Sequence, residues 1–91
     1  MLLMILECVP QRLRGELSRW LIEPKAGVFV GRVPATVREI LWDKAVNGSG
    51  EGSIVQIWTT NNEQGFKIRS HGQGSRELID HEGLTLVRFV Q

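Results

Sequence analysis

LLMILECVPQRLRGELSRWL, residues 2–21, contains two apolar patterns in succession. Residues 2–6 are continuously apolar and too few for a helix of normal length, which is typical of a central strand covered on both faces. Pro10 then supplies a fixed φ at a first helical position, and apolar side chains recur at helical spacing: Leu13, Leu17, Trp20 and Leu21. The stretch therefore predicts a strand followed by an amphipathic helix that stops at Pro24.

A second strand and a second helix are predicted downstream. Residues 28–32 are β-branched and aromatic and stand among glycines, which favours a strand. Pro34 opens a helical pattern that ends in the glycine-rich residues 47–52. The apolar residues of this pattern share one face: Val37, Ile40, Leu41 and Ala45.

The last third of the chain predicts further strands. Residues 53–60 and 66–69 are expected to form a hairpin around the turn-forming residues 61–65. A polar, glycine-containing stretch then leads to residues 84–90, which predict a terminal strand. Two helices on one face of a mainly antiparallel sheet indicate an α+β fold, a ferredoxin-like βαββαβ sandwich with an additional C-terminal strand.

Size and composition favour one small globular domain. The 91 residues are 42% apolar and 23% charged, and a single core takes roughly 100 to 150 residues. A domain this small buries only about 60 to 65% of its unfolded surface, so a homodimer is a natural way to bury more. The first apolar run stops at Glu7, far short of the roughly 20 residues that a membrane span needs. With no secretory pattern and one cysteine, Cys8, we expect a cytoplasmic protein without a membrane partner.

Charge is segregated along the chain, although the net charge is only +1. Residues 8–38 contain six cations and two acids, and eight of the eleven cations in the chain are arginine. The planar guanidinium fork suits phosphate better than a mobile ammonium does. If the two helices pack side by side, four arginines mark one phosphate-binding surface: Arg12, Arg14, Arg38 and Arg76. The alternative is a scatter of surface arginines in intramolecular ion pairs.

Glu7 is the candidate catalytic and metal-binding residue, because it ends a buried strand immediately before a helix begins. A lone carboxylate holds magnesium poorly, but a two-fold dimer would bring two copies together. The alternative is a structural acid that the dipole of the following helix favours.

Sequence signatures of several other chemistries do not occur. His71 and His81 lack a zinc-binding spacing, and the nucleophile elbow, the P-loop and the dinucleotide fingerprint are missing from the sequence. A small-molecule regulatory domain of the same fold remains a third class of function, but no glycine-lined apolar pocket can be recognised in the chain.

A series of short sequence words spans nearly the whole chain. They are residues 7–15 (ECVPQRLRG), 26–31 (AGVFVG), 37–42 (VREILW), 60–61 (TN), 65–66 (GF) and 83–84 (GL). In this order and spacing they resemble the CRISPR-associated protein two family, subtype I-E. The resemblance implies a ferredoxin-like homodimer that sits between integrase dimers and holds the foreign duplex DNA to be inserted as a new spacer.

The resemblance also implies roles for particular residues. The arginines that match Arg12, Arg14, Arg38 and Arg76 contact the DNA backbone in relatives. Residues 84–91 correspond to the segment that docks on the integrase subunit, where an added strand would supply main-chain hydrogen bonds. The apolar residues of this segment are Leu84, Leu86, Val87, Phe89 and Val90.

Three positions depart from the family pattern. The wider family is described as magnesium-dependent endonucleases acting on RNA or duplex DNA, with an aspartate where Glu7 stands, so nuclease activity is the alternative function. Ser75 and Thr36 occupy places where relatives often carry a basic residue. Fewer cations predict weaker phosphate binding with a flatter salt dependence.

Overall fold

The computed structural model describes residues 1–72, 76–81 and 84–89, the last two segments as backbone only. The elements in chain order are β1 (Leu2–Glu7), α1 (Gln11–Leu17), β2 (Ile22–Lys25), β3 (Val28–Gly31), α2 (Ala35–Gly48), β4 (Ser53–Thr59), β5 (Phe66–His71), β6 (Arg76–His81) and β7 (Leu84–Phe89). This is an α+β order, and its first six elements are compatible with a ferredoxin-like sandwich.

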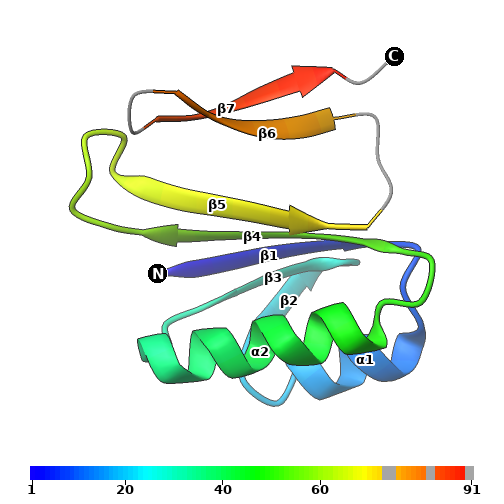
Figure 1. The fold of residues 1–91 in the computed structure, drawn as a ribbon. Helices are drawn as coiled ribbons and strands as arrows, with labels where there is room; N and C mark the ends of the chain where they lie inside the picture. Colours follow the sequence, from blue (N-terminus) through cyan, green and yellow to red (C-terminus); the bar gives the residue numbers. More distant parts are fainter. Residues whose placement is uncertain (73–75, 82–83, 90–91) are drawn as a thin grey trace.

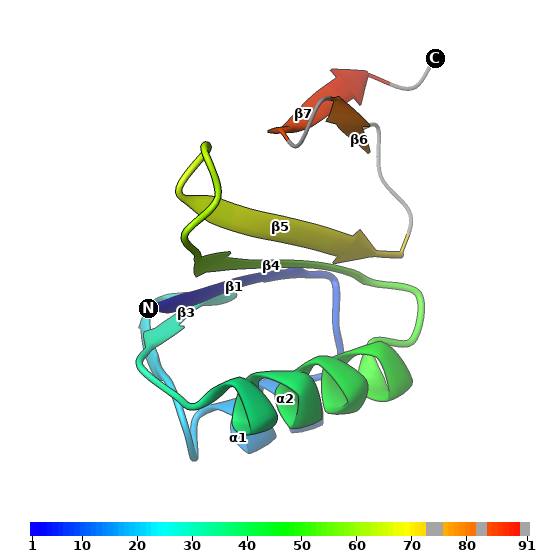
Figure 2. The same ribbon diagram turned by 60° about the vertical axis from the view of Figure 1, so that its left-hand side comes forward.

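The main sheet has five antiparallel strands in the order β2-β3-β1-β4-β5. Its central strand β1 places Met4 opposite Phe29 on one side and Gln56 on the other. Helices α1 and α2 lie side by side over one face of this sheet (Figures 1 and 2). Strands β6 and β7 form a separate two-stranded sheet beyond β5, away from the helices.

The core lies between the sheet and the helices. Alternate residues of β1 face the helices, and Leu2, Met4 and Leu6 are at most 4% exposed. The helices supply side chains at a spacing of four: Leu13 and Leu17 from α1, and Leu41 and Ala45 from α2. Phe29 and Ile54 complete the layer from the strands on either side. The two-residue alternation of the strands and the helical spacing of α1 and α2 thus place their apolar side chains in one layer between the sheet and the helices.

The opposite face of the sheet is also apolar, and we call it the free sheet face. The strand registers place on it Leu3, Ile5, Val28, Val30, Val55, Ile57, Phe66 and Ile68. All of these are partly exposed. Among the residues that the structure describes, no helix covers this face (Figure 2).

The first helix is shorter than the sequence predicted, and the prediction that it stops at Pro24 was wrong. Helix α1 ends at Leu17, and Ile22–Lys25 is the edge strand β2, which pairs with β3. Proline is tolerated in an edge strand because its missing N–H costs no ladder bond there, so Pro24 is part of this strand. Trp20, expected on the buried helix face, is 53% exposed in the turn after α1.

Other predictions were closer. Helix α2, strands β1, β3 and β4, and the β4–β5 hairpin are confirmed, and the terminal strand appears as β7. Ile40 was expected on the buried face of α2 but is 51% exposed. Strand β6 was not predicted, because its residues read as a polar connection. No helix in the described ranges is long and apolar enough to cross a membrane.

Candidate nucleic-acid interface

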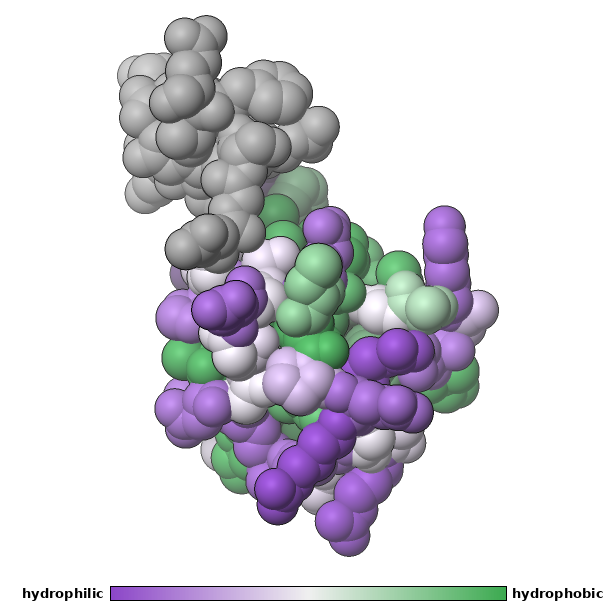
Figure 3. Space-filling model, turned by 90° about the vertical axis from the view of Figure 1, so that its right-hand side faces the viewer, coloured by the Kyte–Doolittle hydropathy of each residue, from purple (hydrophilic) through white to green (hydrophobic). Residues whose placement is uncertain are grey.

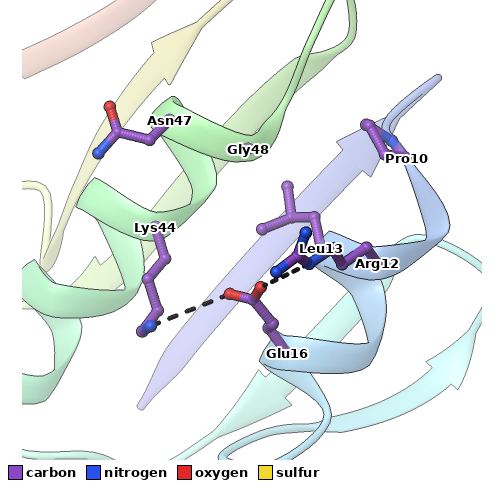
Figure 4. Close-up of a pocket in the computed structure, with 7 residues that line it drawn as sticks. All are labelled: Pro10, Arg12, Leu13, Glu16, Lys44, Asn47 and Gly48. Carbon is purple, nitrogen blue, oxygen red and sulfur yellow. Dashed lines mark ion pairs between the residues drawn. The ribbon is translucent and has the colours of Figure 1, made fainter.

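Arg12 lies on the outer surface of α1 beside the second helix. Its side chain is 92% exposed, and its Nε is 3.7 Å from a carboxylate oxygen of Glu16. The Nζ of Lys44 on α2 lies 3.9 Å from the other oxygen, so two cations from two helices flank one acid (Figure 4). These three side chains line a hollow of about 370 Å³ between the two helices. Exposed pairs of this length contribute little to stability, so both cations can exchange Glu16 for another anion.

Arg14, only two residues further along α1, has a structural partner. Its Nε and Nη2 both bind Oε2 of Glu23, at 2.9 and 2.8 Å, and the backbone N–H of Gly27 donates to the same oxygen at 2.9 Å. The hydrogen bond from Gly27, together with Arg14, lowers the pKa of Glu23 below its ordinary value. Arg14 therefore ties α1 to the β2–β3 turn.

Arg38 lies in the first turn of α2, against the edge of the sheet. Its guanidinium stacks on the ring of Trp58 at 4.4 Å, and its Nε donates to Oε2 of Glu39 at 3.0 Å. Its side chain is 23% exposed. This arginine is fixed in place, whereas Arg12 projects into solvent.

Sequence reasoning missed the group of residues that surrounds Arg38. Arg69 of β5 binds both carboxylate oxygens of Glu39, at 3.1 and 2.8 Å, and its guanidinium lies 4.4 Å from the ring of Trp42 and 5.0 Å from that of Trp58. The hydrogen bonds from Arg69 and then Arg38 lower the pKa of Glu39. Buried Gln56 joins both arginines, accepting from Arg69 Nε at 2.8 Å and donating to the carbonyl of Arg38 at 3.2 Å. We call these residues the arginine cluster: Arg38, Glu39, Trp42, Gln56, Trp58 and Arg69.

One signal for this cluster was present in the sequence. Ile54, Gln56 and Trp58 alternate on the helix-facing side of β4, so a glutamine stands among core residues. A buried polar side chain needs partners, and this one has both amide ends bonded.

The predicted arginines do not gather at one point. Arg12, Arg14 and Arg38 belong to three separate groups of ion pairs, all on the helical side of the sheet. Arg76 begins β6, but its side chain lies outside the described part of the chain. Four further cations in residues 1–72 have no acidic partner there: Arg19, Lys25, Arg32 and Lys67. Figure 3 shows hydrophilic side chains projecting from the helical layer.

Glu7 is exposed at the end of β1, where its backbone pairs with Ser53. The next residue, Cys8, has a positive φ of 56°, so the chain turns sharply towards α1. Gly52 is required here, because a Cβ on it would lie 2.5 Å from the carbonyl oxygen of Glu7. In residues 1–72 no three acidic, histidine or cysteine side chains come together. Within residues 1–72, the donor set of one chain therefore does not fit a magnesium site.

The fold and these groups define an α+β domain that carries arginines on its helical side. Residues 1–86 match the protein family described as CRISPR-associated protein (Cas_Cas2CT1978). The chain therefore belongs to this CRISPR-associated family, as the sequence words indicated.

Proposed function

We propose that this protein is a CRISPR adaptation protein of subtype I-E, which holds foreign duplex DNA together with the integrase subunit for insertion of new spacers. Membership of the CRISPR-associated family supports the biological context. The observation that carries the DNA-holding role is the outward set of cations on the helical side, with Arg12 and Lys44 around Glu16 and Arg38 on Trp58. Such contacts fix a duplex by its phosphates and do not read its sequence.

The free sheet face supports a homodimer. It presents side chains of the same kind as the buried core, from Leu3 and Ile5 on β1 to Ile68 on β5. Contiguous apolar surface of this kind is typical of an interface. A second copy would cover it with an identical surface and place two helical layers on the outside, so that both present their cations.

The terminal strand supports docking on the integrase subunit. Strand β7 pairs with β6 along one edge, and within the described segments its other edge has no strand beside it. An open edge accepts an added strand from a partner through main-chain hydrogen bonds. We assign this role to residues 84–91, with Leu84, Leu86, Val87 and Phe89 in β7 and Val90 outside the described residues.

A salt titration of duplex DNA binding tests the proposed function. Replacing Arg12, Arg38 and Arg76 together with alanine should lower the slope of log affinity against log salt by about 0.9 for each lost phosphate contact. Joint replacement of Lys25, Arg32 and Lys67 with alanine removes three exposed cations without an acidic partner in residues 1–72, and is the control for net charge. If the triple variant bound duplex DNA with the same salt slope as the unmodified protein, these arginines would be excluded as phosphate contacts.

The alternative is a metal-dependent endonuclease, with Glu7 in its site. One observation favours it: Glu7 follows Leu3 and Ile5 on the free sheet face, so a dimer formed there would bring two Glu7 carboxylates towards each other. Cleavage of labelled RNA and duplex DNA, with magnesium or with a chelator, should then disappear in Glu7→Ala and persist in Glu51→Ala. Activity that survives Glu7→Ala would belong to another residue or to a contaminant.

A further inference from the structure

The arginine cluster contains more positive than negative charge. Arg38 and Arg69 share the single carboxylate of Glu39. All three guanidinium nitrogens of Arg69 donate hydrogen bonds, Nε to Gln56 and the two terminal nitrogens to the two oxygens of Glu39. Arg69 therefore satisfies Glu39 in a two-pronged pairing, and the surplus positive charge belongs to Arg38.

Arg38 is held on three sides and open on the fourth. Its ring contact with Trp58, its Nε bond to Glu39 and the bond from Gln56 to its carbonyl fix both the backbone and the side chain. Its two terminal nitrogens make no hydrogen bond to residues 1–72. Neither is buried without a partner, so each keeps some access to solvent.

We propose that Arg69 is a positioning residue, which acts through Glu39 and Gln56 to hold the open guanidinium of Arg38 ready for one phosphate group. The proposal rests on the nucleic-acid function proposed above. A phosphate accepts two parallel N–H bonds from a guanidinium, and the fork must point in one direction to supply them. Ordering the side chain before binding removes an entropy cost that a free arginine, such as Arg12, incurs on binding.

Arg69 does not offer its fork to a phosphate in this arrangement, because Glu39 occupies the two-pronged face of its guanidinium and Gln56 accepts from Nε, although two of its five N–H groups are left over. It also holds Glu39 in the position from which that carboxylate accepts from Nε of Arg38. Without Arg69, Glu39 and Gln56 would both lose their contact with β5, and Arg38 would lose the support of the two residues that fix it. We therefore predict that the pairing of Arg69 with Glu39 affects DNA binding only while Arg38 is present.

A charge-neutral variant tests this directly. Glu39→Gln combined with Arg69→Gln removes one acid and one cation. The net charge is therefore unchanged, and the ion pair between Arg69 and Glu39 is lost. We expect duplex DNA binding at fixed salt to weaken by about threefold to tenfold, which is less than complete loss of a charge-assisted contact would cost, because Arg38 itself is still present. In an Arg38→Ala background the same pair of replacements should change affinity by less than about twofold, because the two effects act through one group.

The chain offers a matched control. Arg14→Gln with Glu23→Gln also removes an arginine–glutamate pair of similar length without changing net charge. Its effect on affinity should be the same whether or not Arg38 is present. An equal loss from the Glu39 and Arg69 replacements in both backgrounds, or no loss in either, would overturn the positioning role.

A second measurement needs no nucleic acid. NMR relaxation of the Arg38 Nε–H should show a rigid side chain in the unmodified protein and a mobile one in Arg69→Gln. Arg69→Lys, which keeps the charge without the fork, should restore only part of the rigidity. Unchanged Arg38 mobility in Arg69→Gln refutes the positioning role, whereas a rigid Arg38 in a protein that binds no duplex refutes the proposed function instead.

Discussion

The two faces of the five-stranded sheet carry the same kind of side chain and differ in what covers them. On β1, Leu2, Met4 and Leu6 face the helices and are almost completely buried, whereas their neighbours Leu3 and Ile5 face the other way and are partly exposed. Both sets come from the same strand, so hydrophobicity does not explain the difference. The helices of the chain cover one face, and under our proposal a second copy of the chain covers the other.

The largest effect is expected from a change on the covered face. Phe29 is fully buried opposite Met4, so Phe29→Ala should lower the free energy of unfolding by about 3 to 5 kcal/mol through lost contacts and a cavity. Chemical denaturation measures this loss. A loss below about 1 kcal/mol would mean that the covered face is not the core.

A charge on the free sheet face should separate assembly from folding. Ile57 lies between Leu3 and Ile68, so Ile57→Lys should abolish self-association by burying an unpaired ammonium in the interface. The monomer should stay folded, because the lysine reaches water when the face is open. Sedimentation velocity measures the oligomer, with circular dichroism as the folding check.

Ile40→Lys is the matched control for this variant. Ile40 is a half-exposed isoleucine on α2, on the helical side of the sheet. It should leave self-association unchanged, whereas equal disruption by both lysines would show that the free sheet face is not the interface.

Acid should weaken the attachment of the helices to the sheet. Glu39 links α2 to β5 and Glu23 links α1 to the β2–β3 turn, and both have a lowered pKa. A lowered pKa gives stability that is complete above the ordinary value of 4.5 and is lost as the pH falls through the lowered pKa. The denaturant concentration at the unfolding midpoint should therefore decrease as the pH is lowered below 4.5. This decrease should be shallower in Glu39→Gln. If the midpoint depended on pH equally in the unmodified protein and in Glu39→Gln, this role of Glu39 would be contradicted.

The smallest effect is expected at the edge of the free sheet face. Ile22 on β2 is 74% exposed, and its register partner is Val30. Ile22→Thr should change unfolding free energy by no more than about 0.5 kcal/mol. Weaker self-association in this variant would show that the interface extends to the edge strand.

Local patterns in the sequence were sufficient for part of this account. They predicted β1, α2 and the β4–β5 hairpin, and the sequence words indicated the family. They failed at β2, because Leu17 and Leu21 keep helical spacing across a turn that tertiary pairing with β3 stabilises. They also grouped Arg12 with Arg14, although residues two apart on a helix do not face the same way.

The arginine cluster could not be found from local patterns at all. Arg69 is 13 residues from Gln56 along the chain, and the antiparallel pairing of β4 with β5 places the two opposite each other. It is 30 residues from Glu39, which meets it because α2 packs on the sheet. Trp58 and Arg38 meet for the same reason, because α2 packs across the strand that carries the tryptophan. The sequence shows where the arginines are along the chain, but the contacts that give each of them its role depend on the fold.

Light scattering of the protein with duplex DNA, at two salt concentrations, tests the central claim most directly. We expect two chains per duplex and binding that weakens steeply with salt. In Ile57→Lys, both the dimer and the tight binding of duplex DNA should be lost. A monomer that binds duplex as tightly as the unmodified protein would contradict the account, as would a stable dimer with no affinity for duplex at low salt.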